Sequence, residues 1–198
     1  NSARQGGGIG IFSSGDVKIT DSTVSGNSVT NDGAGMYIFN YSTTTIVNST
    51  ISGNFPGEGI KIGTLGPVNI ANSTISKNYN GIYNASFAPV KVSHTIIADQ
   101  SSGGNCIGTI TNSGFNIFSD TSCSLLNVVL GFTLPALANN GGPTKTHALI
   151  PGGDGNQAID AGGTSCGVTT DQRGELRPVN YTSLPQAHCD IGAFEVQP

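Results

Sequence analysis

The chain repeats a short pattern of β-branched residues, and this repeat constrains its fold more than any other feature. Alternating apolar positions recur at steps of 27, 24 and 22 residues. These positions are Val17 and Ile19, Thr44 and Ile46, Val68 and Ile70, and Val90 and Val92. Two further registers keep the same steps: Gly8–Ile11, Gly35–Ile38, Gly59–Ile62 and Gly81–Asn84, and the column Val24, Ile51, Ile75 and Ile97. Three registers with identical offsets establish an internal repeat.

Each repeat holds three short strands separated by Gly, Asn or Ser turns, and no segment has helical periodicity. One such unit cannot bury its apolar side alone, whereas stacked units bury a continuous stripe. The repeat therefore predicts an all-β fold, a right-handed parallel β-helix (solenoid) with triangular coils. The hand follows the general preference for right-handed parallel connections. An antiparallel sandwich would not demand the same chemistry at every step, and a propeller blade is longer, at about 40 residues.

Two sets of equivalent positions have defined places in such a stack. Val24, Ile51, Ile75 and Ile97 form an internal aliphatic column. The second set stacks at one turn, where side-chain amides can hydrogen-bond along the stack, and consists of Asn27, Asn54, Asn78 and Gln100.

The repeat divides the chain into two parts. It is clear over residues 6–100 and degenerate over 101–135, where the candidate strands are 108–111 and 115–118. We assign β-helix coils to residues 1–135 and an irregular capping region, packed on the same solenoid, to residues 136–198. Residues 1–150 carry no net charge, so the last 48 residues hold the whole net charge of -4. Because an open solenoid end exposes unpaired strand edges, we expect the capping region to cover such an end.

The composition excludes several classes of protein. Charged residues make up 10% of the 198 residues, against roughly 25% in an average globular domain. This excludes a basic nucleic-acid binder, a coiled coil rich in salt bridges and a disordered tail driven by charge. No run of about 18 apolar residues is present, so the sequence predicts no transmembrane segment. The chain starts at Asn1 without a leader pattern, so for an exported protein we expect this sequence to be a mature or trimmed form.

The capping region contains a series of specific strings. They are NNGGPTKTHAL from Asn139, AIDAG from Ala158, DQRG from Asp171 and CDIGAFE from Cys189. Together with the GGGI and NSTISGN repeats that precede them, these motifs resemble the sequences of choice-of-anchor Q domain proteins of bacterial and archaeal surfaces. The resemblance extends over nearly the whole chain. The resemblance implies a right-handed parallel β-helix in an exported, cell-surface or extracellular protein, and it implies no particular chemistry.

Charged residues of the capping region are candidates for two roles. Asp171 and Arg173, with Arg177, are expected to form buried ion pairs that fix this irregular segment. Asp154, Asp160 and Asp171 lie among glycines and are candidate calcium ligands, although their spacing matches no known calcium loop. We expect no other cofactor.

Four cysteines, Cys106, Cys123, Cys166 and Cys189, allow three pairings. Their order and the boundary of the capping region favour two local disulfides, Cys106 with Cys123 and Cys166 with Cys189. A zinc site is disfavoured because the spacings of 17, 43 and 23 residues contain no CxxC motif. Disulfides indicate an oxidising compartment, and hence an extracellular or cell-surface location.

Five asparagines lie in N-x-S/T sequons and are candidate glycosylation sites: Asn40, Asn48, Asn72, Asn84 and Asn180. Asn48 and Asn72 belong to the repeat, where they also fit a turn or ladder position. Asn40 and Asn84 follow predicted strands, so we expect them at exposed corners and consider them the better acceptors.

Catalytic residues are not evident in the sequence. Enzymes that cleave polysaccharides need two or three carboxylates converging on one face, but Asp16, Asp32 and Glu58 occupy different repeat offsets. The three histidines, His94, His147 and His188, are isolated in the sequence. A surface array for binding ice would need two threonine columns, and only one is present, formed by Thr23, Thr50 and Thr74. We therefore expect no enzymatic activity.

These observations predict a non-enzymatic extracellular module with a structural or adhesive role. The first coil begins without a covering segment, so one hypothesis is a subunit that stacks head to tail into a filament or sheath. The alternatives are a fragment of a longer surface adhesin and a carbohydrate-active β-helix, either a lyase or a hydrolase. Candidate partners are a second copy of the chain and a cell-surface or matrix polysaccharide, and no nucleic acid is expected.

Overall fold

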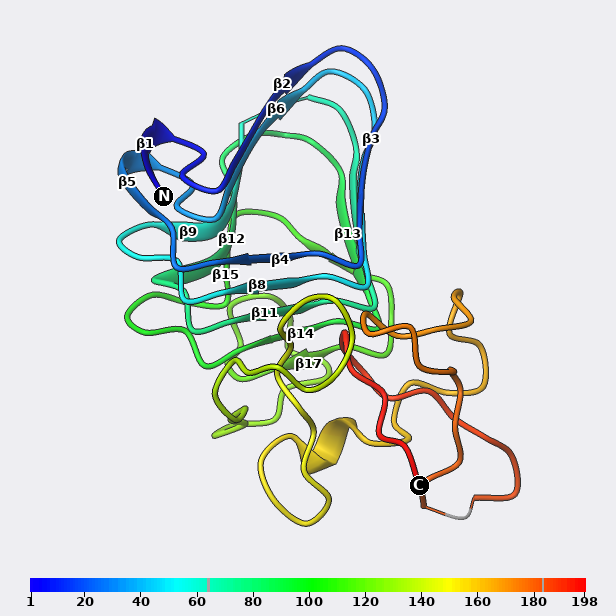
Figure 1. Ribbon diagram of the computed structural model, residues 1–198. Helices are drawn as coiled ribbons and strands as arrows, with labels where there is room; N and C mark the ends of the chain where they lie inside the picture. The colour runs from blue at the N-terminus through cyan, green and yellow to red at the C-terminus, as the bar shows by residue number, and fades with distance from the viewer. Residues whose placement is uncertain (64, 183) are drawn as a thin grey trace.

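The computed structural model describes residues 1–63, 65–182 and 184–198, and its strands stack into a parallel β-solenoid (Figure 1). Three five-stranded sheets form the sides, and each is named here after its first strand. The β2 sheet contains β2 (Ile9–Ser13), β6 (Met36–Asn40), β9 (Glu58–Ile62), β12 (Asn80–Asn84) and β15 (Cys106–Ile107). The β3 sheet contains β3 (Val17–Thr20), β7 (Thr44–Val47), β10 (Val68–Ala71), β13 (Val90–Ser93) and β16 (Thr111–Asn112). The β4 sheet contains β4 (Thr23–Ser25), β8 (Thr50–Ser52), β11 (Thr74–Ser76), β14 (Ile96–Ala98) and β17 (Ile117–Phe118).

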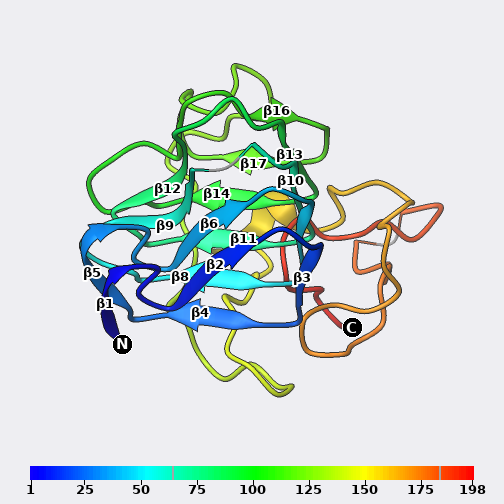
Figure 2. The same cartoon turned by 90° about the horizontal axis from the view of Figure 1, so that it is seen from above.

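Three smaller elements of the described residues, β1, β5 and η1, lie outside these sheets. β1 (Ser2–Gln5) pairs in parallel with β5 (Ser28–Asp32), which connects β4 to β6 at the corner between two sides of the solenoid (Figure 2). The 3-10 helix η1 (Asn156–Ala158) belongs to the C-terminal region.

The three predicted registers are confirmed. In the β3 sheet, Val17, Thr44, Val68 and Val90 pair in sequence. In the β4 sheet, Val24 pairs with Ile51, Ile51 with Ile75 and Ile75 with Ile97. In the β2 sheet, Ile9 pairs with Met36, Met36 with Ile60 and Ile60 with Ile82. Because side chains alternate between the two faces of a strand, these registers place one apolar column from each sheet inside the coil.

A single residue in the left-handed region turns the chain from the β3 sheet into the β4 sheet. The residues at this corner have φ between 47° and 51°: Asp21, Asn48, Asn72, His94 and Phe115. Asp and Asn tolerate this conformation better than other non-glycine residues. The first residue of each NSTISGN-like string therefore marks this corner of the coil.

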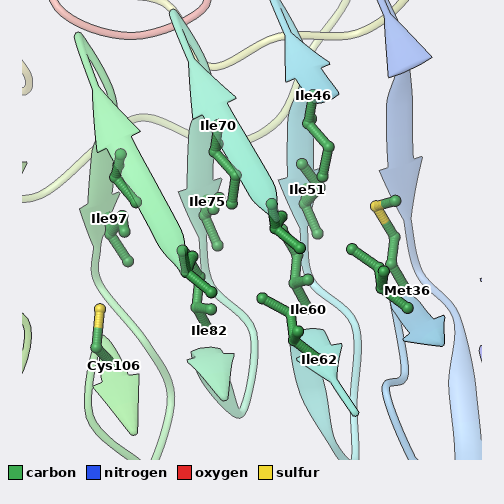
Figure 3. Packing of buried hydrophobic residues seen from close by; sticks show 14 of the residues in the cluster. Met36, Ile46, Ile51, Ile60, Ile62, Ile70, Ile75, Ile82, Ile97 and Cys106 are labelled. Atoms are coloured by element: carbon green, nitrogen blue, oxygen red, sulfur yellow. The ribbon is translucent and has the colours of Figure 1, made fainter. Parts of the chain in front are cut away.

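The core is a set of stacked aliphatic columns (Figure 3). Ile46, Ile60, Ile62, Ile75 and Ile82 are fully buried. The column at the β2 side ends in a cysteine: Ile82 pairs with Cys106 in the last coil. Isoleucine suits these positions because its β-branched side chain packs well on a pleated surface.

A ladder of side-chain amides forms the corner that follows the β4 sheet. Asn27 Nδ2 donates to Asn54 Oδ1 at 3.0 Å, and Asn54 Nδ2 donates to Asn78 Oδ1 at 2.9 Å. Gln100 continues the ladder by accepting from the backbone N–H of Asn78 at 3.0 Å. Asn54 and Asn78 are fully buried, so the predicted amide stack is an internal feature of the coil.

The last coil is closed by the segment that follows it. Phe118 donates its backbone N–H to Asn127 O at 3.0 Å. Asp120 Oδ2 and Ser122 Oγ accept from the backbone N–H groups of Asn105 and Cys106, each at 2.9 Å. Residues 119–129 therefore cover the end of the solenoid that the capping region was expected to cover.

The region that follows, residues 135–198, is called the tail here, and it lies against a side of the solenoid (Figure 1). Thr50 Oγ1 donates to Gln172 Oε1 at 2.6 Å, and Ser52 Oγ lies 2.8 Å from His147 Nε2. Apolar residues of the tail and of residues 129–134 cover the outer face of β14 and β17, where Ile96, Ala98 and Ile117 are buried. The tail was expected to cover an end of the solenoid, but it covers a side instead. The outward Thr, Ser and Ile side chains of the β4 sheet need such a cover.

Candidate functional sites

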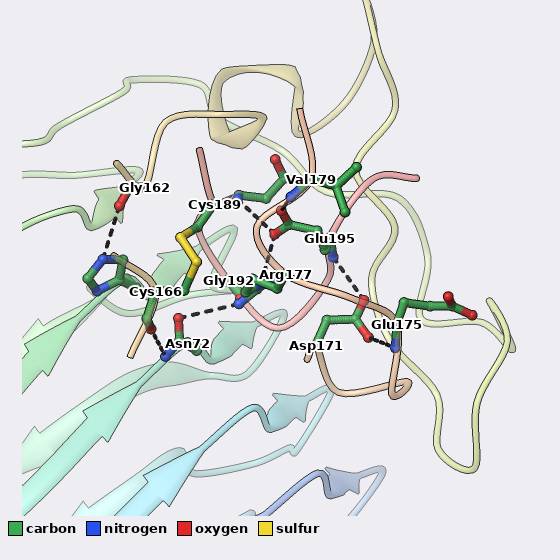
Figure 4. Close-up of polar contacts among 12 residues, drawn as sticks. Asn72, Gly162, Cys166, Asp171, Glu175, Arg177, Val179, Cys189, Gly192 and Glu195 are labelled. Atoms are coloured by element: carbon green, nitrogen blue, oxygen red, sulfur yellow. Dashed lines mark hydrogen bonds and ion pairs between the residues drawn. A yellow bond between two sulfur atoms is a disulfide. The ribbon is translucent and has the colours of Figure 1, made fainter. Parts of the chain in front are cut away.

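Arg177 is at the centre of a buried polar network between the tail and the solenoid (Figure 4). Its side chain is fully buried, and its Nε donates to Glu195 Oε2 at 2.7 Å. Its Nη1 donates to Gly192 O at 2.9 Å and to Asn72 Oδ1 at 3.3 Å. Asn72 in turn donates to Cys166 O at 2.9 Å. The tail is thus fastened to the αL corner of the third coil.

A second ion pair lies beside the first. Arg173 Nη2 is 2.7 Å from Asp171 Oδ2, and its guanidinium lies 3.7 Å from the centre of the Phe194 ring. Asp171 also accepts from the backbone N–H of Glu195 at 2.9 Å. The structure therefore pairs Asp171 with Arg173 as expected, but it pairs Arg177 with Glu195, which sequence analysis missed. The CDIGAFE string, which ends in Glu195, was the available signal.

Burial shifts the pKa of several groups in this seam. Burial, with repulsion from Glu195, raises the pKa of Asp190 to about 7. Burial also raises the pKa of Glu195, against the opposing effect of Arg177. His147 is buried and has a lowered pKa, mainly because of desolvation. Its Nδ1 lies 2.6 Å from Pro135 O. Asp190 and Glu195 lie together, since the backbone N–H of Asp190 donates to Glu195 Oε2 at 2.9 Å, whereas His147 contacts Ser52 at another part of the tail.

Both predicted cysteine pairs form disulfides. Cys106 is bonded to Cys123, and Cys166 to Cys189. The first joins the last coil to the segment that closes it. The second joins the loop that contacts Asn72 to the string that carries Asp190 and Glu195.

The structure corrects the expectation for the sequons. Asn40 and Asn84 are not at exposed corners but buried, with 0% and 4% of their surface exposed. Each side chain turns inward to bond backbone carbonyls: Asn40 Nδ2 donates to Gly15 O of the preceding coil, and Asn84 Nδ2 donates to Ala88 O of the turn that follows it. Asn48 and Asn72 are also buried, in contact with the tail. Asn180 is the one sequon asparagine that is exposed.

The candidate calcium ligands do not come together. Asp154 accepts from Thr133 Oγ1, Asp160 from Thr182 and Asp171 from Arg173. No group of three or more His, Cys, Asp or Glu side chains suited to a metal occurs within residues 1–63, 65–182 and 184–198.

Two carboxylates that the sequence placed at different offsets do converge. Lys61 Nζ lies 3.1 Å from Asp32 Oδ1 and 3.9 Å from Glu58 Oε1. It also lies 3.7 Å from the centre of the Tyr83 ring. The different repeat offsets of Asp32 and Glu58 had argued against such convergence. Asp32 reaches Lys61 because it ends β5, which is not one of the three strands repeated in each coil. Asp16 is elsewhere, with a pKa lowered by hydrogen bonds from Ser42 and Thr43.

Aromatic side chains gather on the outer surface of β2 and β6. We define the aromatic face as Phe12, Tyr37, Phe39 and Tyr41. Ring centres are 5.6 Å apart for Phe12 and Tyr37, 6.4 Å for Phe12 and Phe39, and 5.4 Å for Phe39 and Tyr41. Phe12 is 64% exposed and Tyr41 62% exposed. With Ser13 and Ser14, Phe12, Phe39 and Tyr41 line an open depression of about 420 Å³.

The aromatic face was not predicted from the sequence, although a signal was present. Phe12 and Phe39 occupy the same register position, and Gly10 pairs with Tyr37 at the neighbouring outward position. Outward positions of a β-helix are not required to be apolar, so a pair of aromatic residues there marks a surface with another role.

A second depression, of about 450 Å³, separates the β3 sheet from the tail loop 165–168. Its lining includes Lys18, Asn72 and His94. Desolvation lowers the pKa of His94, whose Nε2 lies 3.0 Å from Gly162 O.

No helix among the described residues is long and apolar enough to cross a membrane. No curated protein and no solved structure matches the chain. The profile described as "Right handed beta helix region" matches residues 1–133, which include all of the coils. This match agrees with the hand predicted from connection preferences. The chain therefore belongs to the right-handed β-helix family.

Proposed function

We propose that this chain is a non-catalytic, ligand-presenting module of an extracellular or cell-surface protein, in line with its resemblance to choice-of-anchor Q proteins. The observation that carries the proposal is the aromatic face, because large exposed aromatic side chains on a rigid sheet mark a contact surface. The two disulfides support an oxidising location.

The placement of the charged groups supports a non-catalytic role. Asp190, Glu195 and Arg177 are buried together in the tail seam. On the β2 sheet, Lys61 forms ion pairs with Asp32 and Glu58 and covers the Tyr83 ring. General acid–base catalysis needs a group free to exchange a proton with a substrate. Because Lys61 is already engaged by Asp32, Glu58 and the Tyr83 ring, it is better suited to holding these neighbours in place than to exchanging a proton.

A screen for polysaccharide cleavage tests this proposal. The purified chain is incubated with neutral and acidic polysaccharides, and release of reducing or unsaturated ends is measured. We expect no release above that of a heat-denatured sample. Release that disappears in the Lys61→Ala and Glu58→Gln variants would overturn the proposal and favour the carbohydrate-active alternative.

Self-assembly is a second candidate, and it rests on the strand edges at one end of the solenoid. β2, β3 and β4 each lie at the edge of their sheet, and Ile9, Val17 and Ile19 there are only partly buried. Such edges can pair with another chain. At the opposite end, residues 119–129 occupy the backbone donors of Asn105, Cys106 and Phe118, so fewer edge groups of the last coil can pair with another chain.

Negative-stain electron microscopy with intact-mass measurement decides this second candidate. Uniform filaments of the 20.1 kDa chain would support stacking. Single particles would contradict it and favour the longer-adhesin alternative, in which further coils pair with β2, β3 and β4.

A further inference from the structure

We infer that the aromatic face binds an uncharged polysaccharide, whose pyranose rings stack on Phe12, Phe39 and Tyr41. This inference rests on the proposed function and specifies its ligand. The rings come from two successive coils, since Phe12 pairs with Phe39 in the parallel register. The ring centres are 6.4 Å apart for Phe12 and Phe39 and 5.4 Å apart for Phe39 and Tyr41, which is on the scale of the spacing of neighbouring sugar units.

The ring geometry suits a sugar chain better than a flat ligand. Phe12 and Phe39 are tilted by 35°, and Phe39 and Tyr41 meet edge to face at 85°. The open depression between these rings therefore presents apolar surfaces in more than one orientation. A pyranose ring has an apolar C–H face and a rim of hydroxyl groups, which matches an apolar floor with polar edges.

Polar groups lie at the edges of this floor. Ser13 and Ser14 line the depression on the first coil. On the third coil, Lys61 pairs with Tyr37 across the sheet and forms its ion pair with Asp32. The hydroxyls of Ser13 and Ser14 provide donors and acceptors for sugar hydroxyl groups, and the Lys61 ion pair flanks the aromatic face beside Tyr37.

The local charge selects an uncharged ligand. Asp32 and Glu58 flank Lys61, and Asp16 lies near the rim through its contact with Ser42. The excess of carboxylates repels polyuronates, sulfated glycans and anionic lipid surfaces.

The size of the aromatic face argues against a second copy of the chain. Four aromatic side chains of roughly 200 Å² each, about half exposed, offer roughly 400 Å² of apolar surface. A stable protein interface buries about 800 Å² on each partner. A sugar chain needs far less contact area.

Affinity gel electrophoresis and calorimetry test the inference with defined probes. The neutral probes are xylan, mannan, mixed-linkage β-glucan and starch, and the acidic probes are polygalacturonate and alginate. We expect at least one neutral probe to retard the protein, with little dependence on salt. Phe12→Ala and Tyr41→Ala should each weaken this binding at least tenfold, about 1.4 kcal/mol. Both residues are largely exposed, so the fold should persist, as circular dichroism can verify.

Phe87→Ala is the matched control, because Phe87 is 99% exposed but lies in the loop between β12 and β13, two coils from Tyr41, where it lines a different depression. It should bind like the wild type. Absence of binding to every neutral probe, salt-sensitive binding to acidic probes alone, or equal binding by all three variants would overturn the inference. Reaction products are measured in parallel: missing binding without products overturns only this inference, whereas products overturn the proposed non-catalytic function.

Discussion

The amide ladder shows how much a single side chain contributes to the repeat. Asn54 is fully buried and bonds both neighbouring coils, since its Oδ1 accepts from Asn27 and its Nδ2 donates to Asn78. Its Nδ2 also donates to Val24 O at 3.0 Å. A buried polar group without a partner is costly, so a ladder is stable only when every member is present.

Replacement of Asn54 by alanine should therefore destabilise the protein by about 2–4 kcal/mol, because it leaves donors and acceptors on two coils without hydrogen-bond partners. Urea denaturation measures the free energy of unfolding. Asn69→Ala is the control, at a half-buried outward position of β10, and should change stability by less than about 1 kcal/mol. Equal effects of the two substitutions would show that the ladder adds nothing.

Asp190 should make stability depend on pH. Its pKa is raised from 3.8 to about 7 by burial and by Glu195, so the folded state holds this proton more tightly than the unfolded chain. The contribution to stability is then greatest at acidic pH and declines as the pH rises through about 7.

The Asp190→Asn variant lacks this titration. Its free energy of unfolding should decline less than that of the wild type between about pH 4 and about pH 8. The two proteins are compared by the slope of the free energy of unfolding against pH. His94 and His147 contribute to this slope in both proteins, and the altered bonds to Asp160 and Val196 change the absolute stability of the variant. Parallel pH profiles would contradict the assignment.

At the scale of elements, strands were predictable and the placement of the tail was not. Each coil strand buries a β-branched side chain at a fixed step, so Val24, Ile51 and Ile75 reveal their pairing in the sequence. The tail has no period, and its contacts join residues far apart: Thr23 and Gln172 are separated by 149 positions. The Thr23, Thr50 and Thr74 column was recognised, but nothing local showed that the tail covers it.

The candidate sites divide in the same way. Cysteine order and the boundary of the capping region favoured the two pairs that the structure forms. The surroundings of Lys61 were not predictable, because Asp32 reaches it from β5, a strand outside the repeat. Exposure of Phe12 and Tyr41 depends on which loops cover the β2 sheet, and alternation along a strand does not encode this.

Gln172 should control docking of the tail. It is 1% exposed, its Oε1 accepts from Thr50, and its Nε2 donates to Thr23 and Thr144. In the Gln172→Ala variant, amide hydrogen exchange should increase in the tail more than in the core strands of the coils. Gln157→Ala, at an exposed position of η1, is the control. Uniform acceleration over the whole chain would indicate that tail and coils unfold together.

At the scale of the whole molecule, two disulfides secure the least regular segments. They close loops of 17 and 23 residues, for which loop entropy predicts about 3 kcal/mol of stabilisation each. The double variants Cys106→Ser/Cys123→Ser and Cys166→Ser/Cys189→Ser should each lose about this much.

A reductant should lower the Tm of the wild type further than that of either double variant, as differential scanning fluorimetry can measure. A variant without cysteines controls for direct effects of the reductant. A wild-type Tm that is insensitive to complete reduction would contradict a stabilising role for the disulfides.

The tail also bears on the order in which the molecule is completed during synthesis. A bare stack of coils can grow one repeat at a time from local contacts. Here the first coil receives its outer cover from Lys145 and Gln172, which leave the ribosome or a secretion channel more than a hundred residues after Thr23. Until then, the hydroxyls of the β4 sheet and the side chain of Ile96 face solvent or a chaperone. Formation of this outer cover thus requires synthesis beyond Gln172, and a product terminated before Lys145 leaves the outer face of the β4 sheet uncovered.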